Sequence, residues 1–274
     1  MVPVTSIVFC VVTLFISLIL PVLAVILFSA KNRKQGILSA WLLGAAGFFV
    51  TQILIRLPIL TALQGQSWFL SFSQNHLFGY AFSLAFTAGL FELAGRFVVS
   101  KLLQRKLTYN RSLAAGLGHG GIEAMLLIGM TYVNNLIYIV MINSGSFDAM
   151  IAQTAAIPEA AAQLELIRQQ FLTSSPFLFA LAGLERLLAM TGHVAMSMLV
   201  CYGVAHKKVL FCTALCLAIH TLMDLTAGIS LVLPQSIAYP IIYAILIAMA
   251  VLSLFVIREL RRRWNKEVTH DSEE

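Results

Sequence analysis

Charged residues are scarce in this chain: they make up 11% of its 274 residues, whereas 59% are hydrophobic. A soluble globular domain carries about 25% charged residues and is roughly half apolar. The composition therefore excludes an ordinary soluble protein, a disordered tail and a disulfide scaffold, and it indicates a polytopic helical membrane protein. The net charge of +6 does not point to nucleic acid, because the basic residues lie in short clusters between long apolar runs. We therefore expect the lipid bilayer, and no nucleic acid, as a partner.

The sequence also lacks the usual signatures of metal and redox sites. It contains no C-x-x-C motif and no H-E-x-x-H motif. The four cysteines lie in or beside apolar segments, where a packing role is favoured over a metal or redox role. We therefore expect no cofactor. The cysteines are Cys10, Cys201, Cys212 and Cys216.

Seven apolar runs are long enough to cross the membrane. A bilayer core of about 30 Å requires about 20 apolar residues in a helix. The runs are residues 4–28, 37–61, 77–99, 112–142, 177–205, 209–233 and 237–257. The sequence thus predicts an all-α polytopic membrane protein with seven transmembrane helices in one integral membrane domain, residues 1–274.

Basic residues are missing from alternate loops. Loop 64–76 contains no Lys or Arg and loop 143–175 contains only Arg168, whereas basic clusters follow the first, third, fifth and seventh runs. The positive-inside rule then predicts a multi-pass protein of the cell (plasma) membrane with its N-terminus outside and its C-terminus in the cytoplasm. The tail 258–274, which is basic and then acidic, would be cytoplasmic. In the long outer loop, residues 158–171 have one apolar face and predict an amphipathic helix on the membrane surface.

Several ionisable residues lie inside the apolar runs. A charge at the membrane centre costs about 2.5–3.5 kcal/mol on insertion scales, so such residues are functional candidates by default. Arg56 in the second run is expected to extend to the outer rim and to carry little functional weight. The candidates in the third to sixth runs are Glu92, Arg96, His119, Glu123, Glu185, Arg186, His193, His220 and Asp224.

Three of these candidates share one estimated depth. Glu123, His193 and His220 each lie twelve to fourteen residues from a basic residue at the predicted inner end of their spans. At 1.5 Å per residue this distance is about 18–21 Å. We expect the three side chains to line one cavity in the membrane. Three separate polar contacts between helices are the alternative.

Local spacing adds further candidates. Residues four apart on a helix share a face. Asp224 is expected to orient an imidazole, and Glu92 with Arg96 is first interpreted as a structural ion pair. For Glu185, a functional role and a structural pairing both remain open. The i, i+4 pairs beside the shared layer are His119 with Glu123, His193 with Ser197 and His220 with Asp224.

Glycines precede Glu123 in the fourth run. Gly116 and Gly120 form a small-residue face that favours close helix packing. A deformable segment beside a site is the alternative, because each glycine weakens a helix by up to about 1 kcal/mol relative to alanine.

Three stretches resemble one family. GLGHGGIEAMLL (116–127), ERLLAMTGHVAMS (185–197) and HTLMD (220–224) are similar to the YhfC-type membrane peptidases of bacteria. Those are related to type II CAAX prenyl endopeptidases, PrsW-type proteases and the Aph subunit of γ-secretase. The resemblance implies a four-helix catalytic core over 112–257 and three peripheral spans over 1–111.

The resemblance also implies roles for particular residues. Glu123 matches the catalytic glutamate, His193 the histidine of the next motif, and His220 with Asp224 the final H-x-x-x-N/D motif. Prenyl endopeptidases carry E-E-x-x-x-R, which Glu92 and Arg96 resemble with one glutamate. Either glutamate is therefore a candidate for the first motif.

We expect an intramembrane endopeptidase of glutamic type that hydrolyses a membrane protein or a lipidated peptide. Glu123 would be the general base for water, and His193 and His220 would stabilise the oxyanion. A zinc peptidase with His193, His220 and Glu123 as ligands is one alternative. A non-catalytic scaffold and a transporter are the others, and no oligomeric state is indicated. Residues expected to support the site are His119, Glu185, Ser197, Glu92 and Arg96.

Overall fold

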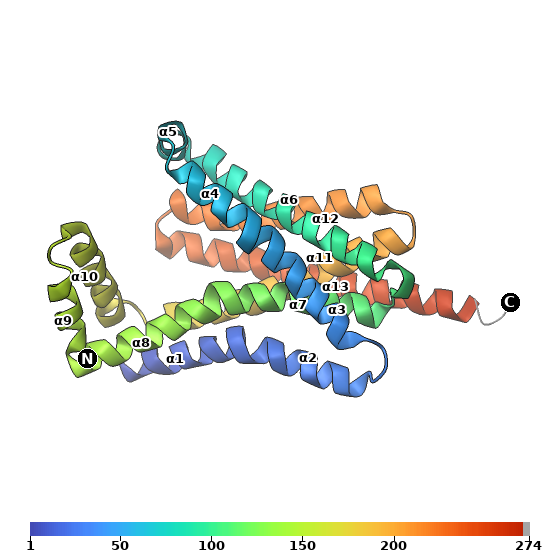
Figure 1. The fold of residues 1–274 in the computed structure, drawn as a ribbon, viewed down its shortest axis with the longest axis horizontal. Helices are drawn as coiled ribbons and strands as arrows, with labels where there is room; N and C mark the ends of the chain where they lie inside the picture. Colours follow the sequence, from blue (N-terminus) through green and yellow to red (C-terminus); the bar gives the residue numbers. More distant parts are fainter. Residues whose placement is uncertain (271–274) are drawn as a thin grey trace. The chain divides into compact units, whose positions relative to one another are not determined.

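The computed structural model describes the backbone of residues 1–270 and the side chains of residues 1–265. Each regular element in this part of the chain is a helix, as the composition predicts (Figure 1). The acidic end of the predicted tail, residues 271–274, lies outside it. The label η marks segments of π-helix or 3-10 helix. The elements are α1 (Val4–Leu14), η1 (Phe15–Ile19), α2 (Leu20–Lys31), α3 (Ile37–Phe48), η2 (Phe49–Arg56), α4 (Leu57–Gln64), α5 (Ser67–Asn75), α6 (Leu77–Leu103), η3 (Gln104–Lys106), α7 (Tyr109–Glu123), η4 (Ala124–Gly129), α8 (Met130–Ser144), α9 (Ser146–Gln153), α10 (Pro158–Thr173), α11 (Phe177–Ala205), α12 (Val209–Leu225), η5 (Thr226–Leu231) and α13 (Gln235–His270).

Seven helical segments of the described residues are long and apolar enough to cross a membrane, which confirms the predicted number of spans. Several continue beyond their apolar runs, because polar residues at the ends keep the helical conformation. The short helices α5 and α9, which the sequence does not predict, lie between spans. The seven segments are Val4–Lys31, Ile37–Gln64, Leu77–Lys106, Tyr109–Ser144, Phe177–Ala205, Val209–Leu231 and Gln235–Asn265.

Three spans contain a turn of π-helix: η1, η2 and η4. Such turns are rare and are found mostly near functional sites. In the second span, η2 ends at Arg56 and Pro58 lies in the first turn of α4, where its missing N–H is tolerated. A π-helical segment thus lies just before Pro58.

The contacts divide the chain into two compact units. The first comprises Met1–Pro21 and Ala124–Leu187. In its apolar core the Tyr132 hydroxyl donates to the carbonyl oxygen of Phe179 at 3.0 Å. Helix α10 confirms the predicted amphipathic helix, and Phe171 on its apolar face is buried in this core.

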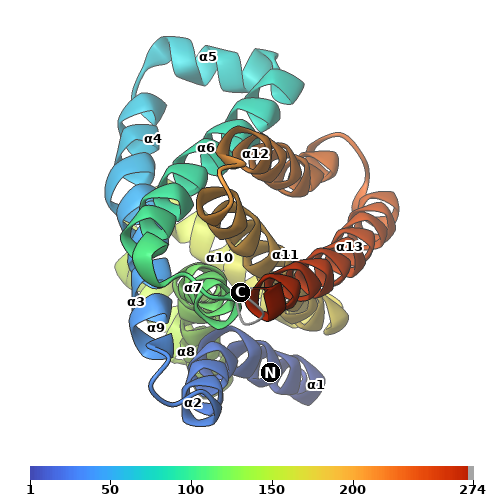
Figure 2. The same ribbon diagram turned by 90° about the vertical axis from the view of Figure 1, so that its right-hand side faces the viewer.

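The second unit comprises Val22–Glu123 and the described residues from Leu188 onward. Figure 2 shows α11 in the middle of this unit, with α6, α7, α12 and α13 around it. Buried residues of α11 account for much of the core, because this part of the helix has neighbours on nearly every side. They are Val194, Met196, Met198, Leu199, Val200, Cys201 and Tyr202.

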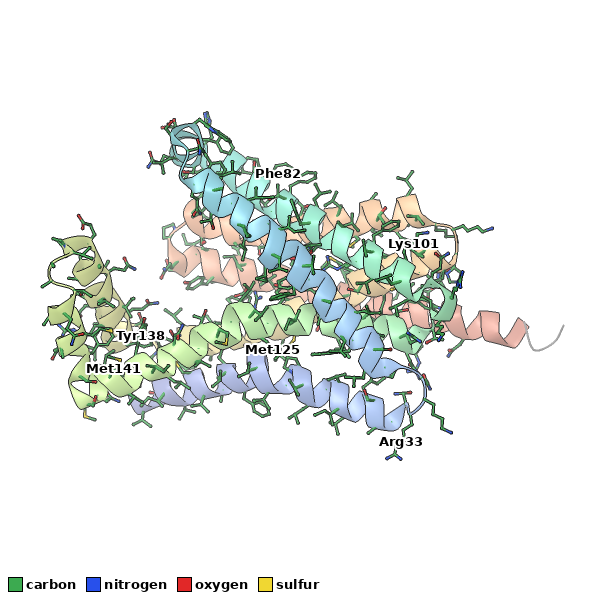
Figure 3. The ribbon with its side chains drawn as sticks, viewed as in Figure 1. Arg33, Phe82, Lys101, Met125, Tyr138 and Met141 are labelled. Atoms are coloured by element: carbon green, nitrogen blue, oxygen red, sulfur yellow. The ribbon has the colours of Figure 1, made fainter. Side chains whose placement is uncertain are left out.

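Basic side chains gather at one end of the second unit. Arg33, after α2, and Lys101, near the end of α6, are both exposed and lie toward the same end of this unit in Figure 3. The alternation of basic loops predicts this arrangement, because both residues follow odd-numbered spans. The side of the membrane on which they lie stays a prediction.

Candidate functional site

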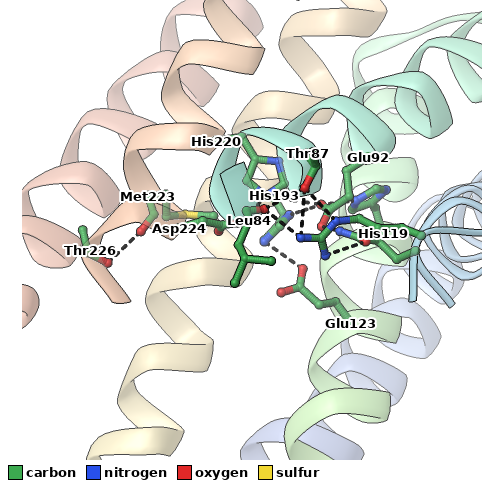
Figure 4. A network of polar contacts seen from close by, with 12 residues as sticks. Leu84, Thr87, Glu92, His119, Glu123, His193, His220, Met223, Asp224 and Thr226 are labelled. Carbon is green, nitrogen blue, oxygen red and sulfur yellow. Dashed lines mark hydrogen bonds and ion pairs between the residues drawn. The ribbon is translucent and has the colours of Figure 1, made fainter. Parts of the chain in front are cut away.

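Seven ionisable side chains from four helices meet inside the second unit (Figure 4). We call them the polar cluster. Their hydrogen bonds and ion pairs join α6, α7, α11 and α12, so residues up to 128 positions apart lie together. The members are Glu92 and Arg96 of α6, His119 and Glu123 of α7, His193 of α11, and His220 and Asp224 of α12.

Small residues bring α7 against its neighbours. Gly116 and Gly120 face α11, and a Cβ on Gly120 would lie 2.9 Å from the Cβ of His193. On another side of α7, a Cβ on Gly118 would overlap the carbonyl oxygen of Trp41 in α3. The predicted close-packing role of the glycines is therefore confirmed. This packing holds the end of α7, which carries a carboxylate of the cluster, beside α11.

Glu92 lies at the centre of the cluster. Gln52 Nε2 donates to its Oε1 at 2.6 Å, and Arg96 donates to its Oε2 at 3.0 Å. His119 Nε2 lies 2.9 Å from the same Oε2. An ionised carboxylate only accepts, so this imidazole nitrogen carries the proton. The predicted ion pair of Glu92 and Arg96 is confirmed, and both residues are almost completely buried.

Arg96 sets the tautomers of two histidines. Its guanidinium lies 2.6 Å from Nδ1 of His193 and 3.3 Å from Nδ1 of His220. A guanidinium always donates, so both Nδ1 atoms accept and both Nε2 atoms carry protons. Nε2 of His193 then faces Glu123 Oε2 at 2.8 Å, and Nε2 of His220 faces Asp224 Oδ2 at 3.4 Å. One fixed cation thus directs two N–H groups at two carboxylates.

Those two carboxylates form the accessible edge of the cluster. The side chain of Glu123 is 11% exposed and that of Asp224 is 32% exposed, whereas that of Glu92 is 4% exposed. Glu92 and Arg96 balance each other in the interior, while the edge carries negative charge. Glu123 and Asp224 are therefore the most exposed members of the cluster.

The second span extends the network, which the sequence reasoning missed. Arg56 donates to the Oε1 of Gln52 at 3.2 Å, to the carbonyl of Leu84 at 2.7 Å and to Thr87 Oγ1 at 3.3 Å. Since Gln52 in turn donates to Glu92, Arg56 is linked to the cluster, and its expected place at the membrane rim stays a prediction. The sequence feature that could have revealed this link is the i, i+4 spacing of Gln52 and Arg56 in an apolar run.

Of the residues expected to support the site, Ser197 lies beside the cluster and Glu185 lies in the other unit. Ser197 lines a cavity of about 10 Å³ together with Arg96 and His119, which is room for about one water molecule. Ser197 Oγ and Arg96 Nε have no partner among the described residues, and a water there would satisfy them. Glu185, in the first unit, pairs with its neighbour Arg186 at 2.5 Å.

A larger cavity of about 590 Å³ is separate from the cluster. Side chains of α6, α11, α12, η5 and α13 line it, and nearly all are apolar. In α12, Ile219 and Leu222 line this cavity. Because an α-helix turns by about 100° per residue, these two side chains lie on the opposite side of α12 from His220 and Asp224. The cavity therefore lacks the groups needed for hydrolysis.

Similarity to known proteins extends over most of the chain. Residues 16–263 match the family described as YhfC intramembrane metalloprotease, a range that contains every member of the polar cluster. The chain belongs to the YhfC family. It is also 28% identical over 243 residues to the "Uncharacterized membrane protein YhfC" of Bacillus subtilis (strain 168), covering 86% of this chain and 90% of that protein. No solved structure matches.

Membership in the YhfC family confirms the resemblance seen in the sequence. It places the chain among the intramembrane proteases, which are hydrolases, and identifies it as a multi-pass integral membrane protein. The YhfC family description also implies a metal ion, which would need donor atoms of suitable type and spacing.

The structure offers one group of donors among its described residues. Atoms of Glu92, His119 and His193 lie within 4.8 Å of one another, and all three residues are buried. Carboxylate and imidazole groups are common zinc ligands. This group shares His193 with the predicted ligand set but replaces His220 and Glu123. The types and spacing of the donors therefore suit a metal ion.

The surroundings of these donors do not suit one. Arg96 lies 3.0 Å from the Oε2 of Glu92 and 2.6 Å from the Nδ1 of His193, so its guanidinium is bonded to two of the three donor groups. Two cations in one buried site repel strongly. The residues do not fit a metal ion while Arg96 is in place.

Proposed function

We propose that this chain cleaves peptide bonds of membrane proteins or lipidated peptides inside the bilayer, with Glu123 as the general base that activates water. The observation that carries the proposal is the pairing of Glu123, at the accessible edge, with a His193 N–H whose direction is fixed by Arg96. A base whose carboxylate is held in one orientation loses little freedom when it takes up a proton from water.

Contacts and exposure favour Glu123 over Glu92 as the base. Glu92 accepts from Gln52, Arg96 and His119, and its side chain is 4% exposed. A carboxylate held by a buried arginine is stabilised in its charged form and would bind a proton poorly. Glu123 faces a His193 N–H instead, and its side chain is more exposed than that of Glu92.

The proton balance of the reaction follows from these positions. Glu123 takes a proton from water as the water oxygen bonds to the scissile carbonyl carbon, and the carbonyl electron pair moves to its oxygen. The N–H groups of His193 and His220 face Glu123 and Asp224 in this structure, and with substrate bound we expect them to turn toward this oxyanion and stabilise it. When the C–N bond breaks, the proton held by Glu123 passes to the leaving nitrogen. Asp224, 3.4 Å from His220 Nε2, would keep that imidazole in its orientation.

The proposal is tested by comparing wild type with Glu123→Gln, which keeps the shape of the side chain and removes the base. Glu159→Gln is the matched control, because Glu159 is an exposed carboxylate of α10. The three proteins are produced at equal amounts in the same cells, and new N-termini in the membrane fraction are identified by mass spectrometry.

We expect termini inside membrane segments with wild type and with Glu159→Gln, and their loss with Glu123→Gln. The same termini with Glu123→Gln would contradict the assignment of the base. The absence of such termini with wild type in every host membrane tried would contradict proteolysis of host membrane proteins.

A further inference from the structure

We propose that Arg96 is the resident cation of the polar cluster: it takes the place that a divalent metal ion would need, and its removal would open a zinc site made by Glu92, His119 and His193. This inference goes beyond the proposed function, because it concerns metal binding and is measured without cleavage.

Two of the three donor pairs have nearly the separation that zinc requires. A tetrahedral zinc ion with bonds of about 2.0–2.1 Å has ligand atoms roughly 3.3 Å apart. Glu92 Oε2 lies 2.9 Å from His119 Nε2 and 3.5 Å from His193 Nδ1. All three donor atoms lie within 4.8 Å of one another, so rotations of these side chains would bring them around one ion. The backbone of three helices thus holds a metal-sized set of ligands.

Arginine and metal compete for one lone pair. His193 Nδ1 lies 2.6 Å from the Arg96 guanidinium, which only donates, so the Nδ1 lone pair is engaged by it. A zinc ion would bind through the same lone pair. The Oε2 of Glu92 is contested in the same way, because Arg96 donates to it at 3.0 Å. One cation can hold these atoms at a time.

Arg96 cannot easily move away. Its side chain is 1% exposed, and it bonds to Glu92, to His193 and, through its other nitrogen, to His220. A metal ion entering the cluster would therefore meet a fixed positive charge in a buried site. This is the physical reason for the mismatch with the family description.

The test measures metal content rather than activity. Wild type, Arg96→Met, and the double variant of Arg96→Met with His119→Ala are purified with a tag that contains no histidine. Each is exposed to equimolar Zn²⁺, desalted and measured by inductively coupled plasma mass spectrometry. Met keeps most of the length of the side chain and removes the charge.

We expect background zinc in wild type, a gain to about one ion per chain in Arg96→Met, and loss of that gain in the double variant. Zn²⁺ should also raise the Tm of Arg96→Met and leave that of wild type unchanged, because a ligand stabilises only the state that binds it.

Two results would overturn the proposal: a stoichiometric zinc ion in wild type that is lost with His119→Ala, or a folded Arg96→Met that gains none.

If Arg96→Met does not fold, Arg96→Gln is produced in cells with and without added zinc. Zinc-dependent recovery of folded protein supports the proposal, and no recovery overturns it. Zinc in a wild type whose cleavage resists chelation would overturn this inference and leave the glutamate mechanism standing.

Discussion

Replacing Glu92 with Gln should destabilise the protein far more than the small change in shape suggests. The new amide oxygen can still accept from Gln52, but an NH₂ group then replaces the Oε2 that accepts from Arg96 and His119. His119 can shift its proton to the other nitrogen, whereas Arg96 cannot. A buried arginine without its counter-ion costs about 3–5 kcal/mol. Since proteins have about 5–15 kcal/mol of stability, this loss is a large share of it.

Thermal unfolding of the purified protein in detergent measures this loss. At about 2–4 °C per kcal/mol, Glu92→Gln should lower the Tm by roughly 6–20 °C. Glu123→Gln is the matched control: its amide oxygen can accept from the His193 N–H, so its Tm should fall by no more than about 4 °C. If Glu92→Gln unfolds at the wild-type temperature, Glu92 is not what stabilises the buried arginine, and the account of the cluster interior fails.

Three further results are expected. Gln52→Ala leaves one oxygen of the central carboxylate without its donor and should cost about 1–3 kcal/mol in thermal unfolding; an unchanged Tm would show that the second span does not support the cluster. Gly118→Ala places a methyl group against the facing backbone of α3 and should lower the free energy of unfolding by about 1–3 kcal/mol or more. In the control Gly65→Ala the methyl group meets only an ordinary contact and should be tolerated, so equal Tm values for the two variants would disprove the close helix approach. Because the native cysteines are buried, an impermeant maleimide applied to intact cells should label Gln163→Cys and not Lys106→Cys, and the reverse pattern would invert the predicted topology.

The seven spans could be predicted because membrane insertion depends on length and hydropathy, and both are written in the sequence. The π-helical turns could not, since each depends on how a span packs against its neighbours. Residue counting gave Glu123, His193 and His220 one depth, and the structure places these three side chains in a continuous set of contacts.

Residue counting also assigned different depths to some residues that contact one another in the structure. Glu92 lies nine residues before Lys101, or about 14 Å from the basic end, and so falls outside the estimated layer of Glu123. Depth along a helix says nothing of direction around it, and long side chains such as Arg96 bridge several ångströms. The central place of Glu92 and the contribution of Gln52 therefore required the structure.

We propose that Glu123 activates the water that cleaves the substrate. The most direct measurement is the cleavage rate of a membrane segment identified from its new terminus, in liposomes containing purified wild type or Glu123→Gln, with and without a strong chelator. Losing a general base lowers a rate by about 10²–10⁴-fold. We predict a loss of at least that size for Glu123→Gln and no effect of the chelator on wild type. A wild-type rate in Glu123→Gln, or a chelator-sensitive rate restored by Zn²⁺, would contradict the account.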